Sequence, residues 1–501
     1  MITLTAEEAG RALGLMPLAA AVSGVSIDSR SIRFGDLFVA LRGERYDGHD
    51  FVDSAMAAGA SGAVVETREW AGRRSAAESQ MAGGGGWPIY EVEDTLEALG
   101  VLAREVRRKS RVTVLAITGS VGKTSTKDLL GAMVGKVRRV VMTKANQNNE
   151  VGVPLTLLAI EPDTEVLIVE MGMRGSGQIA ALARVAEPDV GVITNVYPVH
   201  LELLGTLENV AEAKGELIAS LRQGGVAVVP FECGLLGPYT ATAVCRVVTF
   251  GFGPGAEGAD VHGSLEVSGR EAGQVLSVRW PEGKVEIETP LASRHSLENA
   301  VAGAAACYGA GLPVNECVAG ILEVQFTRAR GDVMRLPGLC IINHTYNASP
   351  AAVRVALDEL VRIAAELRGR PVAVLGDMLE LGQQSERYHR EAGAYAAEAG
   401  VGVLWGVGPL SRATVEGFRD AWEARPETAT GWVAGHVGSA EETSSVMADL
   451  RGGDVVLFKA SRSMKLETMV SRVVDEAEAG RWTSAPDRIT GRGNGIGESQ
   501  S

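Results

Sequence analysis

The sequence predicts an α/β protein of three domains. The chain has 501 residues, and a domain typically takes ~100–200 residues. Short apolar runs alternate with helix-sized gaps over residues 112–230 and again over residues 340–461. Such alternation predicts mostly parallel sheets covered by helices. Residues 1–90 precede both blocks and are expected to form a small domain of their own.

The expected boundaries follow from changes in composition. Residues 75–87 are small and polar and contain four consecutive glycines, which is typical of a loop near a domain end. The end of the chain lacks apolar periodicity, which indicates disorder. The predicted parts are an N-terminal domain of residues 1–90, a central domain of residues 91–330, a C-terminal domain of residues 331–480 and a disordered tail of residues 481–501.

Each element of the two blocks is predicted from its pattern. Residues 253–290 show short alternating segments, so we expect antiparallel strands or a small excursion there. The Ala-rich residues 296–322 are expected to be helical. The expected strands are 112–118, 166–170, 190–196 and 225–230 in the central domain and 340–343, 371–377, 401–408 and 454–461 in the C-terminal domain.

Composition excludes several classes of protein. Hydrophobic residues make up 46% and charged residues 22% of the chain, as in a soluble globular protein. The net charge is −14 and no long basic stripe is present, so nucleic acid is not an expected partner. The five cysteines lack close pairing, which predicts reduced, buried thiols. The start has no basic leader and no stretch reaches ~20 apolar residues, so we expect a cytoplasmic protein without membrane insertion.

The strongest motif is a glycine-rich loop between a predicted strand and a predicted helix. Glycines let backbone N–H groups turn around phosphate oxygens, and the helix N-terminus points at the anion. Lys123 can reach the outer phosphates of ATP, and the Thr124 hydroxyl can hold Mg²⁺. The loop lacks the first glycine of the full pattern, where Ile117 stands, but its context supports a nucleotide site. Its residues are Gly119, Ser120, Val121, Gly122, Lys123, Thr124 and Ser125.

Further polar side chains are expected at the same edge of this sheet. Glu170 ends one predicted strand and His200 follows the next. The carboxyl ends of parallel strands face the ligand crevice, and a carboxylate there suits a metal bound by ATP. Taken alone, a glutamate at a strand end is more often a surface residue, and a lone histidine is more often structural or solvated. Lys214 reads as a solvated helix lysine.

The order and spacing of the motifs resemble the Mur ligases, from around residue 22 to 475. In the first domain the matching segments are Asp28-Ser29-Arg30, 35–43 and 47–49. In the second they are 118–127, 148–154, 170–175, 194–202 and 213–216, and in the third 346–348, 375–382 and 461–464.

The resemblance implies a small α/β uridine-binding domain, a central P-loop ATPase domain and a Rossmann-like C-terminal domain. It implies an ATP-dependent amide ligase of peptidoglycan precursor synthesis that uses Mg²⁺. The implied substrates are UDP-N-acetylmuramoyl-tripeptide and D-alanyl-D-alanine, joined through an acyl phosphate. We expect a monomer, because no interface stripe is evident in the sequence.

The resemblance also implies roles for individual residues. Lys123, Lys214 and His200 match catalytic positions, and Lys214 matches a lysine that is carbamylated in some related ligases. Thr124, Glu170 and His200 match metal ligands. His295 and Asn299 resemble an adenine-proximal motif, and Arg330, His344 and Asn347 complete the implied ATP contacts. The implied substrate-binding residues are Ser29, Arg30, Asn148, Asn149 and Glu150.

Five positions depart from the family's pattern. Tyr197, Ser293 and Ala460 stand where glycine is usual, His344 where Asp is usual, and Ser349 where Asn is usual. Three alternatives therefore stay open beside the ligase: the same chemistry on a different amine, a catalytically weak paralogue that binds nucleotide or precursor, and a simple P-loop kinase or ATPase.

Overall fold

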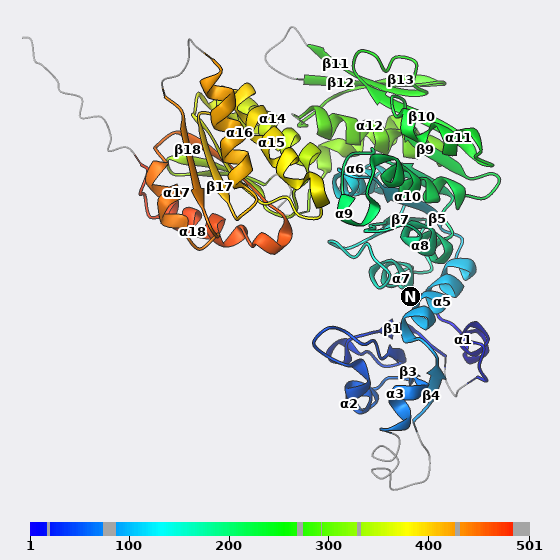
Figure 1. Ribbon diagram of the computed structural model, residues 1–501. Coiled ribbons are helices and arrows are strands. Elements are labelled where there is room, and N and C mark those ends of the chain that lie inside the picture. Colours follow the sequence, from blue (N-terminus) through cyan, green and yellow to red (C-terminus); the bar gives the residue numbers. More distant parts are fainter. Residues whose placement is uncertain are drawn as a thin grey trace, which may run out of the picture. The chain divides into compact units, whose positions relative to one another are not determined.

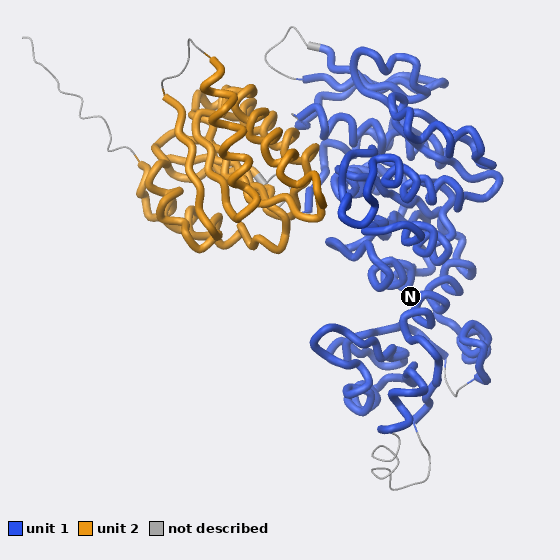
Figure 2. The backbone as a smooth tube through the Cα atoms, in the orientation of Figure 1, with its two compact units in different colours: residues 1–327 blue, residues 328–501 orange. Residues whose placement is uncertain are grey.

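The computed structural model describes residues 1–17, 21–73, 87–267, 274–291, 293–327, 332–425 and 431–483. The chain divides into two compact units, residues 1–327 and 328–501 (Figure 2). The first unit holds two sheets and the second unit holds one (Figure 1). Arg330, most of the glycine-rich stretch and residues 484–501 of the predicted tail lie outside the described residues.

The first sheet has four parallel strands in the order β1-β2-β3-β4. All four residues of β2 and the first four of β3 are buried, and Phe38, Val52 and Val65 belong to one core of this region. The strands are β1 (Gly24–Ser26), β2 (Asp36–Val39), β3 (Gly62–Glu66) and β4 (Ile89–Val92), and the helices are α1 (Ala6–Leu13), α2 (Val52–Ala57) and α3 (Thr67–Ala71).

Helix α5 (Thr95–Lys109) leads from the first sheet to the second. Asp94 begins the helix, because its carboxylate accepts hydrogen bonds from the backbone N–H groups of Leu96 and Glu97. The last turn is basic, which suits the negative end of the helix dipole. The basic residues of that turn are Arg107, Arg108 and Lys109.

The central sheet has nine strands in the order β13-β12-β11-β10-β9-β8-β5-β7-β6. Neighbours from β6 to β11 pair in parallel, whereas β12 is antiparallel to β11 and to β13. Antiparallel strands within residues 253–290 are thus confirmed, and they extend the main sheet. The strands are β5 (Thr113–Thr118), β6 (Val140–Met142), β7 (Val166–Glu170), β8 (Val190–Ile193), β9 (Val226–Pro230), β10 (Arg246–Phe252), β11 (Val261–Val267), β12 (Gln274–Trp280) and β13 (Gly283–Glu288).

Both faces of the central sheet are covered. Leu115 and Ile117 of β5 pack in one core with residues of α6 and α12, while the equally buried Val114 and Ala116 point to the opposite face. Burial on both faces explains why the strands read as continuous apolar runs. The helices are α6 (Lys123–Gly135), α7 (Gly152–Leu158), α8 (Gln178–Ala186), α9 (Leu201–Leu204), α10 (Leu207–Ala219), α11 (Gly237–Ala241), α12 (Arg294–Gly309) and α13 (Val314–Val318).

Two expectations for this region need correction. The helix expected over residues 296–322 is interrupted after Gly309, because Gly311 has a left-handed φ of +67° and Pro313 lacks a backbone N–H. The strand expected over residues 190–196 ends at Ile193. Strands β6 and β10 were not expected, because their apolar runs are short or interrupted by polar residues.

The second unit contains a six-stranded sheet in the order β14-β15-β19-β16-β17-β18. Strand β14 is antiparallel to β15 and the other neighbours are parallel. Ile341 and Ile342 are adjacent in β15 but belong to different cores, so both faces are packed. The strands are β14 (Asp332–Leu336), β15 (Leu339–His344), β16 (Pro371–Gly376), β17 (Val403–Val407), β18 (Val433–Val437) and β19 (Asp454–Lys459), and the helices are α14 (Pro350–Leu367), α15 (Ser385–Glu398), α16 (Arg412–Glu423), α17 (Thr443–Asp449) and α18 (Glu467–Glu478).

Two properties of the chain bear on its expected environment. The five cysteines are free thiols, four of them buried and Cys233 half-buried. Among the helices that the structure describes, none combines the length and the apolar character that a membrane crossing requires.

Candidate active site

The glycine-rich loop joins β5 to α6. Gly119 has a φ of +146° and Gly122 a φ of +85°, backbone conformations that L side chains rarely adopt. A Cβ on Gly119 would collide with Thr194 Oγ1, and a Cβ on Gly122 would lie 2.5 Å from Asn299 Oδ1. No side chain caps the start of α6 at Lys123, so its first backbone N–H groups can face an anion.

The loop lies where the strand order of the central sheet reverses. Strand β5 is flanked by β7 on one side and β8 on the other. The chain fills the β7 side first and then crosses to β8, and ligands of open parallel sheets bind at such a switch point. Glu170 is the last residue of β7. His200 lies between β8 and α9 and has a left-handed φ of +54°.

The segment after β8 fastens the glycine-rich loop. Asn195 Oδ1 accepts a hydrogen bond from the Val121 N–H at 2.9 Å, and Asn195 Nδ2 donates to the Val121 carbonyl at 2.9 Å. Thr194 Oγ1 donates to the same carbonyl at 2.7 Å. The Tyr197 N–H donates to Ser120 Oγ at 2.8 Å, and this hydroxyl lies 2.8 Å from the Tyr197 carbonyl. In the sequence, Thr194 and Asn195 stand out only as part of the matched segment 194–202, although a polar pair directly after a buried strand signals a role.

Replacing Asn195 with alanine is expected to loosen this loop. The variant loses both hydrogen bonds to Val121 and should lose about 1–3 kcal/mol of unfolding free energy. The KM for ATP should rise, because the loop amides are no longer held in place. Urea unfolding and steady-state kinetics measure the two effects. Asn195→Asp keeps the acceptor and should show a smaller loss; an unchanged KM in Asn195→Ala would contradict the fastening role.

Glu170 connects the loop to β7. Its side chain is fully buried. Its Oε2 accepts from Thr124 Oγ1 at 2.7 Å and its Oε1 accepts from Asn148 Nδ2 at 2.8 Å. Its backbone N–H donates to Thr143 Oγ1 at 3.0 Å, a contact that the sequence did not indicate. The predicted metal ligands Thr124 and Glu170 are therefore in direct contact, and the predicted substrate residue Asn148 joins them.

The oxygen atoms of this contact suit Mg²⁺. Thr124 Oγ1 and Glu170 Oε2 are hard oxygen ligands, and Mg²⁺ typically takes only one or two protein ligands beside phosphate and water oxygens. In the part of the chain that the structure describes, no group of three or more His, Cys, Asp or Glu side chains is arranged to hold a metal. The two oxygen atoms match the share of ligands that a protein gives to an Mg²⁺ bound to phosphate.

Lys214 is a buried lysine of α10 that is 1% exposed. Burial lowers the pKa of Lys214 well below its ordinary value, and the charge of Lys123 lowers it further. No carboxylate forms an ion pair with Lys214 among the described residues. A buried lysine without an acidic partner has an amine that is more often neutral, which is the reactive form of the side chain. The solvated lysine expected from the sequence alone is therefore wrong.

His295 and Asn299 lie beside the glycine-rich loop. A Cβ on Gly122 would be 3.0 Å from His295 Nε2 and 2.5 Å from Asn299 Oδ1. His295 Nε2 and Asn299 Nδ2 are buried and have no hydrogen-bond partner. Buried polar atoms are rarely left unpaired, so these two atoms fit a polar ligand at the loop.

The structure accommodates the departures from the family's pattern. Ser293 and Ser349 are the N-caps of α12 and α14, and their side chains accept from the N–H groups of Ser296 and Ala352. Serine is a favoured N-cap, so neither position needs glycine or asparagine. Tyr197 and Ala460 are not among the residues with positive φ, so neither side chain strains the backbone.

The remaining predicted ATP contacts belong to the second unit. His344 is the last residue of β15, and its Nε2 lies 2.8 Å from Glu359 Oε2 of α14. Asn347 is exposed, its Oδ1 accepts from the Ala348 N–H at 2.9 Å and its carbonyl accepts from Lys459 Nζ at 3.0 Å. Their roles in binding ATP stay predictions, as does that of Arg330.

His344→Asp tests the contact with Glu359. Aspartate places a second carboxylate near Glu359, so the variant should lose about 1–3 kcal/mol of unfolding free energy at neutral pH. His344→Gln retains a polar group without the repulsion and should lose less. Chemical denaturation measures both. A lower KM for ATP in His344→Asp would show that position 344 also faces the nucleotide, whereas equal stability of all three proteins would contradict a stabilising contact with Glu359.

The predicted substrate residues are spread over two regions. Arg30 is exposed, and its hydrogen bonds to Asp28 lower the pKa of Asp28 to about 2. Ser29 is half-buried in the same turn. Asn149 Oδ1 accepts from the Gly152 N–H at 3.0 Å at the start of α7, and Glu150 is exposed. The structure thus brings Asn148 to the loop but keeps Ser29 and Arg30 on the first sheet.

Together, the fold and site define a P-loop nucleotide-binding protein of the α/β class. Three family models match it: Mur ligase family, catalytic domain, over residues 21–107; Mur ligase middle domain over residues 117–307; and Mur ligase, glutamate ligase domain, over residues 329–462. The chain belongs to the Mur ligase family, which confirms the family and fold that the motifs predicted.

Individual relatives match nearly the whole chain. The UDP-N-acetylmuramoyl-tripeptide–D-alanyl-D-alanine ligase of Bacillus subtilis (strain 168) is 34% identical, with 91% of this chain and 93% of the relative covered. The structure of MurF from Acinetobacter baumannii has a TM-score of 0.78 at 26% identity and covers 94% of this chain and 99% of that one. MurF from Thermotoga maritima in complex with ADP has a TM-score of 0.74 at 28% identity and covers 91% and 98%.

Proposed function

We propose that this chain is an ATP-dependent ligase that joins D-alanyl-D-alanine to UDP-N-acetylmuramoyl-tripeptide. The observation that carries the proposal is the contact between Thr124 of the glycine-rich loop and the fully buried Glu170. These residues would form part of a phosphate and metal site, in a chain that is 34% identical to a ligase of that name. The T. maritima neighbour that binds ADP supports a nucleotide at this site.

The proposed reaction has two steps. A carboxylate is a poor electrophile, so a carboxylate oxygen of the tripeptide first attacks the γ-phosphorus of ATP and ADP leaves. The amine of D-alanyl-D-alanine then attacks the acyl carbon, phosphate leaves and the amide forms with loss of a proton. The transferred phosphoryl group and the tetrahedral oxyanion both concentrate negative charge. The loop amides and Lys123 would stabilise this charge.

Residues of this chain fit the proposed cofactor. Thr124 and Glu170 would hold Mg²⁺, with His200 as a further ligand. Bound with ATP, Mg²⁺ would neutralise charge on the phosphate oxygens. His295 and Asn299 offer unpaired polar atoms to the nucleotide. A carbamate on Lys214 would supply an anionic oxygen ligand in place of an ammonium that repels the metal.

We assign the remaining parts by the same logic. Residues 1–90 would bind the uridine end through Ser29 and Arg30, residues 91–330 would bind ATP, and residues 331–480 would complete the site. Asn149 and Glu150 would line the tripeptide. The substrates are nucleotide-linked precursors, so we place the reaction in the cytoplasm, with the protein acting as a monomer.

Phosphate release tests the function. Purified protein is incubated with ATP, Mg²⁺ and UDP-N-acetylmuramoyl-tripeptide, with and without D-alanyl-D-alanine. Release that depends on D-alanyl-D-alanine is the expected result. Release only with another amine would replace the proposed substrate, and release that needs neither precursor nor amine would indicate a simple ATPase. Binding of both nucleotides without release would identify a weak paralogue.

A further inference from the structure

A second pocket lies at the opposite edge of the central sheet from the glycine-rich loop. It has a volume of about 1010 Å³. Thr113, Val190 and Val226, the first residues of β5, β8 and β9, line it, whereas the glycine-rich loop follows the end of β5. The proposed ligase reaction uses none of its residues.

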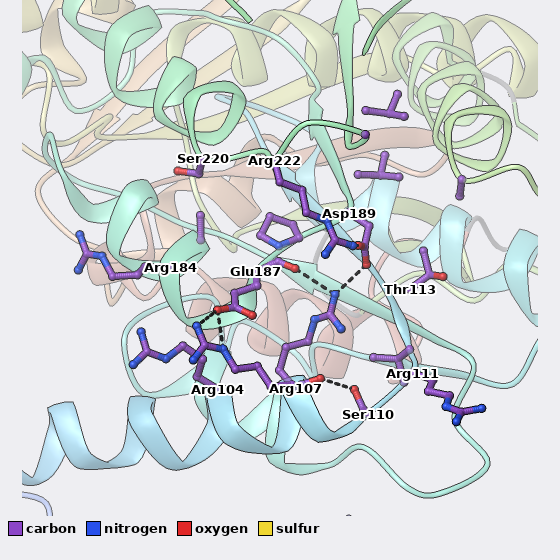
Figure 3. Close-up of a pocket in the computed structure, with 18 of the residues that line it drawn as sticks. Arg104, Arg107, Ser110, Arg111, Thr113, Arg184, Glu187, Asp189, Ser220 and Arg222 are labelled. Carbon is purple, nitrogen blue, oxygen red and sulfur yellow. Dashed lines mark hydrogen bonds and ion pairs between the residues drawn. The ribbon is translucent and has the colours of Figure 1, made fainter. Parts of the chain in front are cut away.

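Arginines dominate this pocket, which we call the arginine pocket (Figure 3). Six arginines line it against two carboxylates, Glu187 and Asp189, in a chain whose net charge is −14. They come from α5, from the segment after it, from α8 and from the segment after α10. The six are Arg104, Arg107, Arg108, Arg111, Arg184 and Arg222.

One group of these side chains is held in place. Arg107 donates to the Glu187 carbonyl at 3.1 Å and to Asp189 Oδ2 at 2.8 Å (Figure 3). Asp189 also pairs with Arg222 and accepts from the Val114 N–H at 2.9 Å. Arg108 pairs with Glu187. Arg107, whose side chain is only 10% exposed, is therefore held in place, so a ligand would not need to order it.

A second group has no acidic partner. Arg104, Arg111 and Arg184 form no ion pair or hydrogen bond with any other described residue, and Arg111 and Arg184 are exposed. The two carboxylates of the pocket are already engaged by Arg107, Arg108 and Arg222. The positive charge of the second group is therefore not balanced within the pocket.

Helix dipoles offset only part of the positive charge in the arginine pocket. The pocket is lined by the C-terminal ends of α5, α8, α10 and α12, at Ser110, Glu187, Ser220 and Ala310. Each helix C-terminus counts as about −0.5 charge, so four of them offset about two of the four excess positive charges. An excess of about two positive charges remains. Planar guanidinium groups favour phosphate oxygens, which they bind in pairs.

We propose that the arginine pocket binds a small molecule through a phosphate or diphosphate group that carries about two negative charges. The guanidinium groups of Arg104 and Arg184 provide its main contacts, and the fixed Arg107 forms the wall behind it. The volume of about 1010 Å³ is at the upper end of small-molecule sites. This ligand is distinct from the ATP of the glycine-rich loop.

Calorimetric titration of the full chain with inorganic pyrophosphate tests the proposal. The glycine-rich loop is first saturated with a non-hydrolysable ATP analogue, and free Mg²⁺ is left out because it binds pyrophosphate itself, so that pyrophosphate reports on the arginine pocket. The test variant is Arg104→Gln/Arg184→Gln. The matched control is Arg68→Gln/Arg412→Gln, which removes two exposed arginines that do not line the pocket. Phosphate release by the ligase reaction is measured in parallel.

Wild type and control should bind one pyrophosphate, with affinity that falls as salt rises, and the test variant should bind at least about tenfold more weakly. Its phosphate release should match wild type, which separates this site from the proposed reaction. No pyrophosphate binding in wild type, or equal binding by the test variant, would overturn the proposal. Binding to vesicles of anionic phospholipid that the test variant loses, without pyrophosphate binding, would replace the small molecule by a membrane surface.

Discussion

Lys123→Ala is expected to lower the rate of phosphate release at least about hundredfold, a loss of about 2.7 kcal/mol in transition-state stabilisation. Lys123 Nζ lies 2.8 Å from the Gly119 carbonyl and 3.3 Å from the Ser120 carbonyl, so its charge sits inside the glycine-rich loop. Alanine removes the only side-chain charge of the loop sequence 119–125. The measurement is kcat with ATP, UDP-N-acetylmuramoyl-tripeptide and D-alanyl-D-alanine.

A lysine at the other end of the same helix provides the control. Lys136 caps α6, and its Nζ lies 2.5 Å from Glu323 Oε1. Lys136→Ala loses an exposed ion pair, which is worth ~0–1 kcal/mol of stability, and should keep wild-type kcat. Thermal unfolding of both variants shows that they fold. If Lys123→Ala kept more than about a tenth of wild-type kcat, a loss below ~1.4 kcal/mol, the assignment of the phosphate site would fail.

Lys214→Ala is expected to lose most activity and to regain part of it when a short carboxylic acid is added. The lowered pKa of Lys214 leaves more of its amine neutral, and a neutral amine can add to CO₂ to give a carbamate and a proton. A small carboxylate that enters the space left by the side chain restores an anionic oxygen ligand for Mg²⁺. The assay compares kcat with and without acetate over a range of concentrations.

Two further variants separate the carbamate from the lysine charge. Lys214→Arg keeps a cation but cannot form the carbamate, so it should be as inactive as Lys214→Ala and should not respond to acetate. Lys214→Met replaces the amine by an apolar group, so its comparison with wild type gives the free-energy cost of burying the amine. Because the folded-state pKa of Lys214 lies below its unfolded value, the unfolded chain binds more protons between those two values. Unfolding free energy therefore rises with pH across that window in wild type, and this rise should be absent in Lys214→Met. Wild-type activity of Lys214→Ala without acetate would exclude the role.

The glycine-rich loop and its surroundings show how much of the site could be predicted from the sequence. The order strand, loop, helix and the residues Gly119, Lys123 and Thr124 follow from local chemistry: a buried strand needs an apolar run, and a left-handed turn needs glycine. Glu170 could be placed at the sheet edge for the same reason, because it ends a predicted strand. The alternation of apolar runs along the chain predicted the parallel strands of the central and C-terminal sheets.

Contacts between distant segments could not be predicted in this way. Asn195 fastens Val121 and Thr143 holds Glu170, yet neither pair is close in sequence. The pKa of Lys214 depends on burial that several elements create together. Strand β6 pairs with β7 at the edge of the central sheet, and β10 pairs with both β9 and β11. Both form because neighbouring strands supply hydrogen-bond partners, which a short apolar run does not encode.

The arginine pocket shows most clearly the difference between what the sequence predicts and what only the folded structure reveals. Its arginines are separated in the sequence by up to 118 positions, from 104 to 222, and each one reads as an ordinary basic residue near a helix end. The sequence by itself determined the α/β class and the glycine-rich loop, because these depend on patterns within a few neighbouring residues. It also determined the family, through the order and spacing of motifs along the chain. Only the tertiary structure decided which charges share one pocket, because charge acts through space and the strand order of the sheet sets those distances.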